Sequence, residues 1–372
     1  MRVFKSYTAA ALLCFSVLAG CTSDDKGDTP PSTDFDRQAM LVNYSENLIV
    51  PGYAALSTKT TALEASVAAF ADAPSTGTLA SARAAYQEAY MAWQQVGMYG
   101  FGPAEEQLLR NNINIYPTAT DEIEANVAAG SYDLQAAANL DAKGFPALDY
   151  LLYGAGTEAA VVDQFTAGAQ AANRKKYLQD VASLIQQRTQ AVYEGWTSGK
   201  YAAKFQASTG TAVGSGIGNL VNQLNADIDV TKRAKVGIPS GRFTSGSALP
   251  EKTEAYYSHT SLELLKQAIR AEKAAFMGQS ASGANGQGLD DYLDHVKAPY
   301  NGGLLSEAIE AQFDAALAAA DAVQGPLSDA VTTQPVAVTK VYDALQKLIV
   351  LTKTDMPSAL GVTISYTDND GD

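Results

Sequence analysis

Cysteine and histidine are nearly absent from this sequence, with two of each in 372 residues. Both cysteines, Cys14 and Cys21, lie within the first 21 residues, so the rest of the chain carries no thiol. Thiol catalysis, disulfides and cysteine-ligated metals are therefore excluded there. The two histidines, His259 and His295, form no His-Glu-x-x-His motif, which excludes a zinc peptidase mechanism built on that motif.

Positive charge is also scarce: 26 Lys and Arg stand against 40 Asp and Glu, and the formal net charge is −14. A surface this acidic repels phosphate backbones and anionic headgroups, so we expect no nucleic-acid partner. Alternating β-branched runs are few, whereas long segments follow helical periodicity. The sequence therefore predicts an all-α protein of two tandem helical bundles.

The first twenty residues have the pattern of a targeting segment. Two basic residues, Arg2 and Lys5, precede an apolar stretch over residues 8–18 that is too short to span a membrane. Leu18-Ala19-Gly20-Cys21 is similar to a bacterial lipobox, in which the cysteine is lipidated and becomes the first mature residue. We expect residues 1–20 to be a lipoprotein signal peptide. Cys21 would then anchor the protein to the cell envelope, with the outer membrane as the predicted location on its periplasmic or surface face. The alternative is an ordinary secretory signal with a chance cysteine.

Helix-breaking residues and helical periodicity divide the remaining chain into a tether, two domains and a series of expected helices. Residues 21–33, rich in Ser, Asp, Gly and Pro, predict a flexible tether. A Gly/Ser-rich stretch over 240–249 predicts a boundary between an N-terminal helical domain, 34–240, and a C-terminal helical bundle, 241–372. The expected helices cover residues 34–72 with a break at Pro51-Gly52, 79–99, 146–153, 173–196, 216–231, 250–277, 304–323 and 337–351.

One charged residue, Asp149, stands among apolar and aromatic neighbours between Gly144 and Gly154. Burying an unpaired carboxylate is costly, so Asp149 needs a partner or a function. Pro146 suits the first turn of a helix and Gly154 suits its end, which predicts a short, nearly buried helix over 146–153. Positions 146 and 149 then lie on one face of that helix.

Polar residues also interrupt the buried face of the helix predicted from Pro250. Four of them fall on its core-facing line: Glu251, Glu254, Ser258 and Ser261. Either this part of the helix faces a polar cavity, or its first turns emerge into solvent, where Glu is favoured near a helix N-terminus. Lys235 is a candidate member of the same interdomain site, as a salt-bridge partner of Asp149 or beside Ser258.

The stretch from Gly144 to Asp149 resembles the Gly-x-His-x-x-Glu signature of the imelysin-like family, with Pro146 at the His position and Asp149 at the Glu position. Other blocks similar to that family follow the same order along the chain: Phe101-Gly102-Pro103, Tyr116-Pro117, Lys235-Val236-Gly237-x-Pro239, the Pro250–Ser261 segment and the closing Ser365–Asp372.

The resemblance implies two helical bundles with a polar site between them, in a protein of the bacterial envelope. The family includes an insulin-cleaving peptidase and proteins tied to iron uptake. Its signature His and Glu are the suspected metal or catalytic groups, and Pro146 can neither ligate a metal nor accept a proton. Asp149 and Glu251 are therefore the candidate metal ligands, for a divalent cation such as iron or calcium, because carboxylate-only ligation favours hard cations.

Three functions stay open, and the catalytic residues stay unassigned. The leading one is a lipid-anchored envelope binding protein that works with uptake components for iron or another ligand. The second is a metal-dependent peptidase that uses Asp149, Glu251 and Glu254. The third is a structural surface lipoprotein in which Asp149 is only salt-bridged by Lys235 or Arg233.

Overall fold

The structure is a computed structural model that describes residues 34–365. The predicted signal peptide, the tether, the lipidation residue Cys21 and residues 366–372 lie outside this range. From Asp36 onward the chain belongs to one compact unit. The division into two domains near residue 240 stays a prediction.

The all-α class is confirmed. Over residues 34–365 the only strands are β1 (Pro299–Tyr300) and β2 (Gly303–Leu304), which pair as a small antiparallel hairpin. No helix in that range is long and apolar enough to cross a membrane. The α-helices of the N-terminal half are α1 (Arg37–Asn43), α2 (Val50–Asp72), α3 (Thr76–Gln94), α4 (Pro103–Glu106), α5 (Leu109–Ile113), α6 (Thr120–Ala129), α7 (Gly144–Tyr153), α8 (Glu158–Thr166), α9 (Ala171–Trp196) and α10 (Tyr201–Gln206).

The later α-helices are α11 (Gly216–Val230), α12 (Ser261–Phe276), α13 (Leu289–His295), α14 (Leu305–Asp321), α15 (Leu327–Thr333), α16 (Pro335–Val350) and α17 (Met356–Leu360). Three π-helical segments lie between or beside them: η1 (Tyr44–Ile49), η3 (Thr231–Gly237) and η5 (Leu351–Asp355). Two short 3₁₀ turns complete the set, η2 (Ala137–Asn139) and η4 (Pro250–Lys252).

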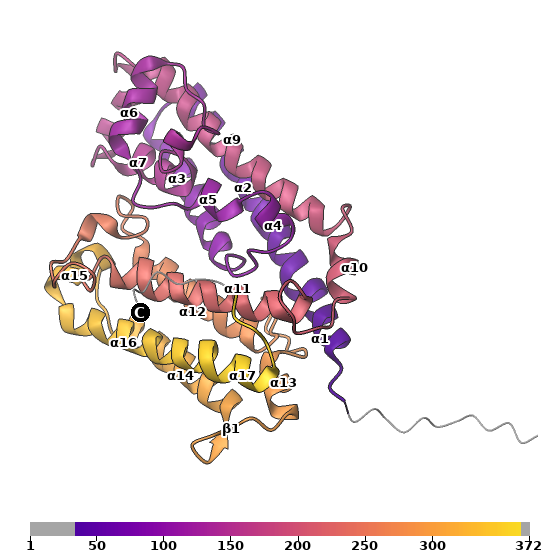
Figure 1. The fold of residues 1–372 in the computed structure, drawn as a ribbon. Coiled ribbons are helices and arrows are strands. Elements are labelled where there is room, and N and C mark those ends of the chain that lie inside the picture. Colours follow the sequence, from indigo (N-terminus) through magenta and orange to yellow (C-terminus); the bar gives the residue numbers. More distant parts are fainter. Residues whose placement is uncertain (1–33, 366–372) are drawn as a thin grey trace, which may run out of the picture. The chain divides into compact units, whose positions relative to one another are not determined.

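Helices α2, α3 and α9 form the centre of the N-terminal half (Figure 1). One side of α9 buries large apolar side chains such as Tyr177, Ile185 and Trp196. Full burial of a large apolar side chain contributes about 1.5–3 kcal/mol, so this stripe holds α9 against its neighbours. Helix α7, which carries Asp149, packs on α9, α3 and α5, and this places the motif inside the helical layer.

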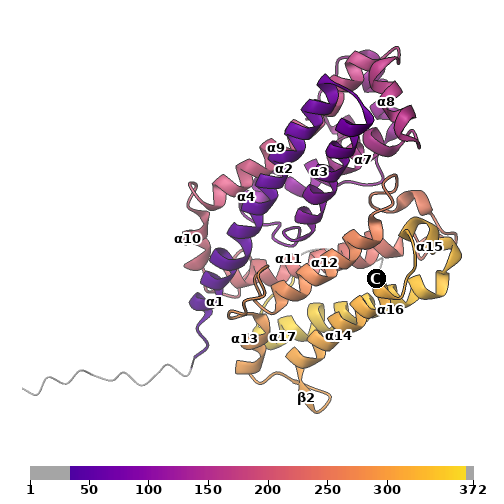
Figure 2. The ribbon, with the colours of Figure 1, turned by 180° about the vertical axis from the view of Figure 1, so that it is seen from behind.

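The C-terminal half is built around α12, α14 and α16, and α11 packs against α12 and α16 (Figure 2). Helix α12 also contacts α3, so it joins the two halves of the chain. Helix α11 thus packs with the C-terminal helices, although it lies before the domain boundary predicted at residues 240–249.

The helix expected from Pro250 begins instead at Ser261. Ala255 and His259 have φ angles of 50° and 59°, which a right-handed α-helix cannot contain. The preceding residues form the 3₁₀ turn η4 and a series of turns. The single helical line proposed for Glu251 through Ser261 is therefore wrong, and the positions of these residues must be taken from the turns.

The expected break at Pro51-Gly52 is also wrong. Pro51 lies in the first turn of α2, where its missing N–H is tolerated, and the irregularity is the π-helical segment η1 just before it. Helix α3 begins at Thr76 and ends at Gln94, a few residues earlier at each end than the periodicity indicates. The residues over 104–144 form short helices and turns, as a stretch without clear periodicity suggests.

Gly144 opens the motif helix at a point of close contact. Its φ is +77°, and a Cβ there would lie 2.5 Å from the carbonyl carbon and oxygen of Ile113, the last residue of α5. Only glycine combines this backbone angle with this approach. Helix α7 then covers the predicted range 146–153 and is almost entirely buried, as expected.

We predict that Gly144→Ala destabilises the protein more than Gly156→Ala. Gly156 has a φ of +82° with no atom within 4 Å of an added Cβ, so alanine there adds only backbone strain, about 1–2 kcal/mol. At Gly144 the clash with Ile113 adds a further 1–3 kcal/mol, roughly the cost of overpacking. Urea unfolding of both variants measures the difference, and equal losses would show that α7 can move away from α5 freely.

Candidate functional site

Asp149 joins three segments of the chain. Its side chain is buried, with 1% of the residue exposed. The Tyr86 hydroxyl of α3 donates to Oδ1 at 3.0 Å, and the backbone N–H of Ser258 donates to the same oxygen at 3.1 Å. The backbone N–H of Tyr257 donates to Oδ2 at 2.7 Å. The structure thus brings Asp149 to the 251–261 segment, through backbone groups of a turn.

The electrostatics of Asp149 reflect burial opposed by hydrogen bonds. Burial raises the pKa of the Asp149 carboxyl to about 6, although hydrogen bonds from Ser258, Tyr257 and Tyr86 act to lower it. Burial, followed by the nearby Asp149 charge, raises the pKa of the Tyr86 hydroxyl well above its usual range. Tyr86 therefore stays a hydrogen-bond donor, while Asp149 changes charge within the mildly acidic range.

Pro146 and Asp149 line a pocket of about 220 Å³. The turn at Tyr116-Pro117, after α5, forms a second wall. Residues 251–253 and 255–257 form the third wall and contribute Glu251. The motif helix, the Tyr-Pro turn and residues 251–257 therefore meet at one small cavity.

This pocket does not supply the ligands of a resident metal ion. Over residues 34–365 no cluster of three or more His, Cys, Asp and Glu side chains could hold one. Both Asp149 oxygens already accept hydrogen bonds, Glu251 is the other carboxylate in the lining, and Lys252 adds a positive charge. A divalent cation needs more oxygen ligands than this pair can offer.

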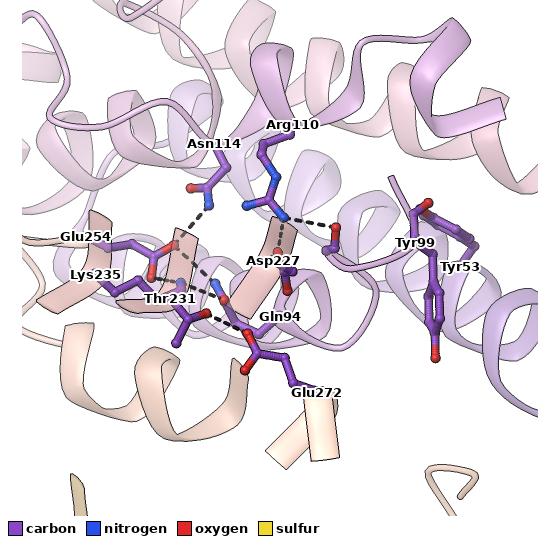
Figure 3. A network of polar contacts seen from close by, with 11 residues as sticks. Tyr53, Gln94, Tyr99, Arg110, Asn114, Asp227, Thr231, Lys235, Glu254 and Glu272 are labelled. Atoms are coloured by element: carbon purple, nitrogen blue, oxygen red, sulfur yellow. Dashed lines mark hydrogen bonds and ion pairs between the residues drawn. The ribbon is translucent and has the colours of Figure 1, made fainter. Parts of the chain in front are cut away.

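Glu254 and Lys235 form a second polar cluster at the contact between the two halves (Figure 3). They make an ion pair in which the residues are 1% and 4% exposed. Asn114 Nδ2 donates to Glu254 Oε1 at 2.9 Å, and Lys235 Nζ donates to Gln94 Oε1 at 2.8 Å. The charges are therefore paired with each other and held by two amides from the N-terminal half, which meets the requirement for burying an ion pair.

A neighbouring set of polar contacts extends this cluster across α11 and α12. Arg110 of α5 pairs with Asp227 of α11 and donates to the Gly97 carbonyl at 2.9 Å. Thr231 donates to Glu272 Oε1 at 2.6 Å. Burial, with the nearby Asp227 charge as the next cause, raises the pKa of the Glu272 carboxyl well above its usual range. Burial and the Asp227 carboxylate thus both disfavour the charged form of Glu272 in this network.

The other residues predicted for the interdomain site lie in different parts of the structure and do not form one cluster. Glu251 is exposed at the mouth of the Asp149 pocket. The Ser258 hydroxyl lies 3.0 Å from that of Thr260 within its own turn, and Ser261 begins α12 with a buried hydroxyl that has no partner among the described residues. Lys235 Nζ bonds to Glu254 and Gln94, so it neither pairs with Asp149 nor activates Ser258.

Sequence reasoning missed the residues of α3 that support both clusters. Tyr86 donates to Asp149, and Gln94 contacts Glu254 and Lys235. Between them Tyr90 donates to Asn114 Oδ1 at 2.5 Å. These three side chains are spaced four residues apart, so their polar atoms share the buried face of α3, whose opposite face is exposed. That spacing is the signal that could have identified them.

Comparison with known proteins gives a match to a family model and to a similar protein. The family model for Imelysin matches residues 49–354. Iron-regulated protein A of Synechococcus elongatus is 22% identical over 333 residues, which cover 84% of this chain and 87% of that protein.

Two solved structures share the fold. A protein described as an iron-regulated protein A precursor from Parabacteroides distasonis gives a TM-score of 0.72 at 21% identity, over 87% of this chain and 94% of the other. An imelysin-like protein from Psychrobacter arcticum gives 0.66 at 20% identity, over 90% and 99%.

The first prediction from this site concerns the pH dependence of stability. In the folded protein the pKa of the Asp149 carboxyl is about 6, whereas an aspartate in the unfolded chain has the ordinary value of 3.8. The unfolded chain therefore releases this proton first, and the contribution of Asp149 to stability falls as pH rises from 4 to 6, by about 3 kcal/mol. Asp149→Asn removes this fall, so its loss of stability relative to wild type is largest near pH 4 and smallest above pH 7.

Chemical denaturation at intervals between pH 4 and 8 measures this difference. Asp163→Asn, at an exposed position of α8, is the control and should follow the wild-type curve. Parallel curves for wild type and Asp149→Asn would mean that the hydrogen bonds fully offset burial and that Asp149 keeps an ordinary pKa.

The second prediction concerns the buried ion pair. Lys235→Met leaves the Glu254 carboxylate buried without its cation and should cost about 3–5 kcal/mol of unfolding free energy. Lys235→Met combined with Glu254→Leu should recover most of that loss, because no unpaired charge is left. Urea unfolding of the two single variants and the double variant gives the coupling, and additive losses would show that the two side chains do not depend on each other.

Proposed function

This chain belongs to the imelysin family, and from that membership we propose that it is a lipid-anchored ligand-binding protein of the cell envelope that takes part in iron uptake. The observation that supports binding most directly is how the two motif residues, Pro146 and Asp149, are arranged at the pocket. Its carboxylate, Asp149, accepts three hydrogen bonds at a pocket whose histidine position is occupied by Pro146.

This geometry favours binding over peptide hydrolysis. A metallopeptidase needs a metal with an open coordination position, or a base that can reach a water molecule. The described residues offer no cluster for the metal, and the Asp149 oxygens are directed at Tyr86 and at the turn carrying Tyr257. The same contacts make Asp149 a rigid element of the pocket wall, as a binding site requires.

The lining indicates what kind of ligand this pocket accepts. Asp149 and Glu251 supply acceptors, and Tyr116, Tyr256 and Tyr257 supply aromatic surface. Carboxylates beside aromatic rings favour a group that donates hydrogen bonds or carries positive charge. If iron is the cargo, it would arrive with its own ligands, because the pocket has too few donors to hold the bare ion.

Two further observations support the proposed location in the cell envelope and the proposed role in iron uptake. The lipobox-like Leu18-Ala19-Gly20-Cys21 supports lipid anchoring at Cys21, which lies outside the described residues. The names of the relatives from Synechococcus elongatus and Parabacteroides distasonis describe them as iron-regulated. A binding protein whose synthesis responds to iron fits a role in uptake.

The test uses cells that lack their own copy of the protein and receive wild type, Cys21→Ser, Asp149→Asn or Asp163→Asn. Under iron limitation, radioactive iron accumulation and the membrane-bound fraction of the protein are measured. Wild type and Asp163→Asn should be membrane-bound and restore accumulation. Asp149→Asn should stay membrane-bound with accumulation reduced severalfold, and Cys21→Ser should leave the membrane fraction.

Each part of the proposal has its own contrary result. Iron accumulation that is the same with and without the protein would overturn the role in uptake. A Cys21→Ser protein that stays in the membrane fraction would overturn the anchor. Hydrolysis of an unfolded substrate by purified wild type, lost in Asp149→Asn, would establish the peptidase alternative instead.

A further inference from the structure

A second pocket, of about 310 Å³, lies between the two halves of the chain and away from the motif helix. One wall is the η1–α2 junction, and the facing wall is α12, which lies beneath the N-terminal helices in Figure 2. The turn after α3 closes one side through Gln95 and Tyr99, and the loop from Gln279 to Gly283 borders another. It shares no residue with the Asp149 pocket.

Small residues on the two facing helices keep this space open. Helix α2 presents Ala55 and the backbone of Gly52, whose missing side chain makes room for Val96, and α12 presents Ala271, Ala274 and Ala275. Side chains of this size cannot fill the gap between two helix surfaces, so the pocket results directly from the residue choice. The volume is within the range of sites that hold small organic molecules.

The polar groups of the pocket form a specific set. Four uncharged amides line it, Asn47, Gln95, Gln267 and Gln279, together with Tyr99. Burial raises the pKa of the Tyr99 hydroxyl, so this group stays a neutral donor and acceptor at every physiological pH. Amides and a phenol can exchange hydrogen bonds with hydroxyl groups in both directions.

Arg270 adds one positive charge to this lining. It is exposed on α12, and over residues 34–365 its guanidinium has no hydrogen bond or ion pair. The guanidinium of Arg270 is therefore available to a ligand, whereas four other arginines pair with carboxylates: Arg83, Arg110, Arg174 and Arg242. A guanidinium beside neutral amides matches a ligand with one carboxylate and several hydroxyls.

We propose that this pocket binds a small polyhydroxylated carboxylate, such as a sugar acid, with Arg270 holding the carboxylate and the amides holding the hydroxyls. An adjoining pocket of about 490 Å³, which shares Asn47, Pro51, Ser280 and Ala281, leaves room for a substituent on the ring. One guanidinium without a second cation or a helix N-terminus favours a monoanionic carboxylate over a phosphate dianion. The site is independent of the Asp149 pocket and of iron uptake.

The experiment titrates purified full-length protein with four probes that share one ring: glucuronate, glucose, glucosamine and glucose 6-phosphate. Saturation-transfer NMR or calorimetry gives each dissociation constant. Glucuronate should bind with a Kd on the order of 1 mM, roughly tenfold or more tighter than glucose or glucosamine, because only its carboxylate pairs with Arg270. Tighter binding of glucose 6-phosphate than of glucuronate would overturn the carboxylate assignment.

Two variants test whether binding occurs in this pocket, one by removing the positive charge of Arg270 and one by reducing the pocket volume. Arg270→Gln should weaken glucuronate roughly tenfold and leave glucose unchanged, since an exposed arginine without partners is not needed for folding. Ala271→Leu should weaken both by filling the pocket. Arg242→Gln, at an arginine already paired with Asp343, is the matched control and should bind as wild type does. Binding of glucuronate that survives both Arg270→Gln and Ala271→Leu, or no saturable binding at all, would overturn the proposal.

Discussion

The contact between the two halves depends on one buried ion pair, Lys235 with Glu254. Removing both charges from water is expensive, and their mutual attraction offsets that cost only if the remaining polar atoms are also satisfied. Gln94 and Asn114, both from the N-terminal half, meet that condition. The pair therefore specifies how the halves meet: a displacement of α3 would remove Gln94 from Lys235, and a displacement of the end of α5 would remove Asn114 from Glu254.

Asp149 plays a related part beside Tyr86 of α3. Its oxygens hold the backbone of the turn at Tyr257 and Ser258, a few residues after Glu254 in the same segment. Groups from the N-terminal half therefore fix this segment at two points: amides bond to the Lys235–Glu254 pair, and Asp149 bonds to the turn. This double attachment explains how a stretch with left-handed residues at Ala255 and His259 stays ordered enough to form a pocket wall.

Periodicity located most of the helices, because α9, α14 and α16 each bury one continuous stripe that their sequences display. It was wrong at Pro250, where polar residues happened to continue the helical line through a segment of turns. The position of Asp149 on a buried helix could be predicted from its apolar neighbours. The spacing within α3 marks Tyr86 as a candidate polar residue on a buried face. Its pairing with Asp149 could not be predicted, because the contact joins residues 63 positions apart and depends on how α3 and α7 pack. The pairing of Lys235 with Glu254 was missed for the same reason.

The π-helical segment η3 decides where the chain can change length in this part of the molecule. A π turn contains about one residue more than an α turn. The wide turns of Thr231–Gly237 therefore take up one extra residue while the positions beyond them keep the direction that a regular helix one residue shorter would give. The regular helix α11 has no such turn. Because each residue turns an α-helix by about 100°, a deletion there would rotate Lys235 away from Glu254 although both residues were still present. Chain length is thus constrained more tightly along α11 than along η3.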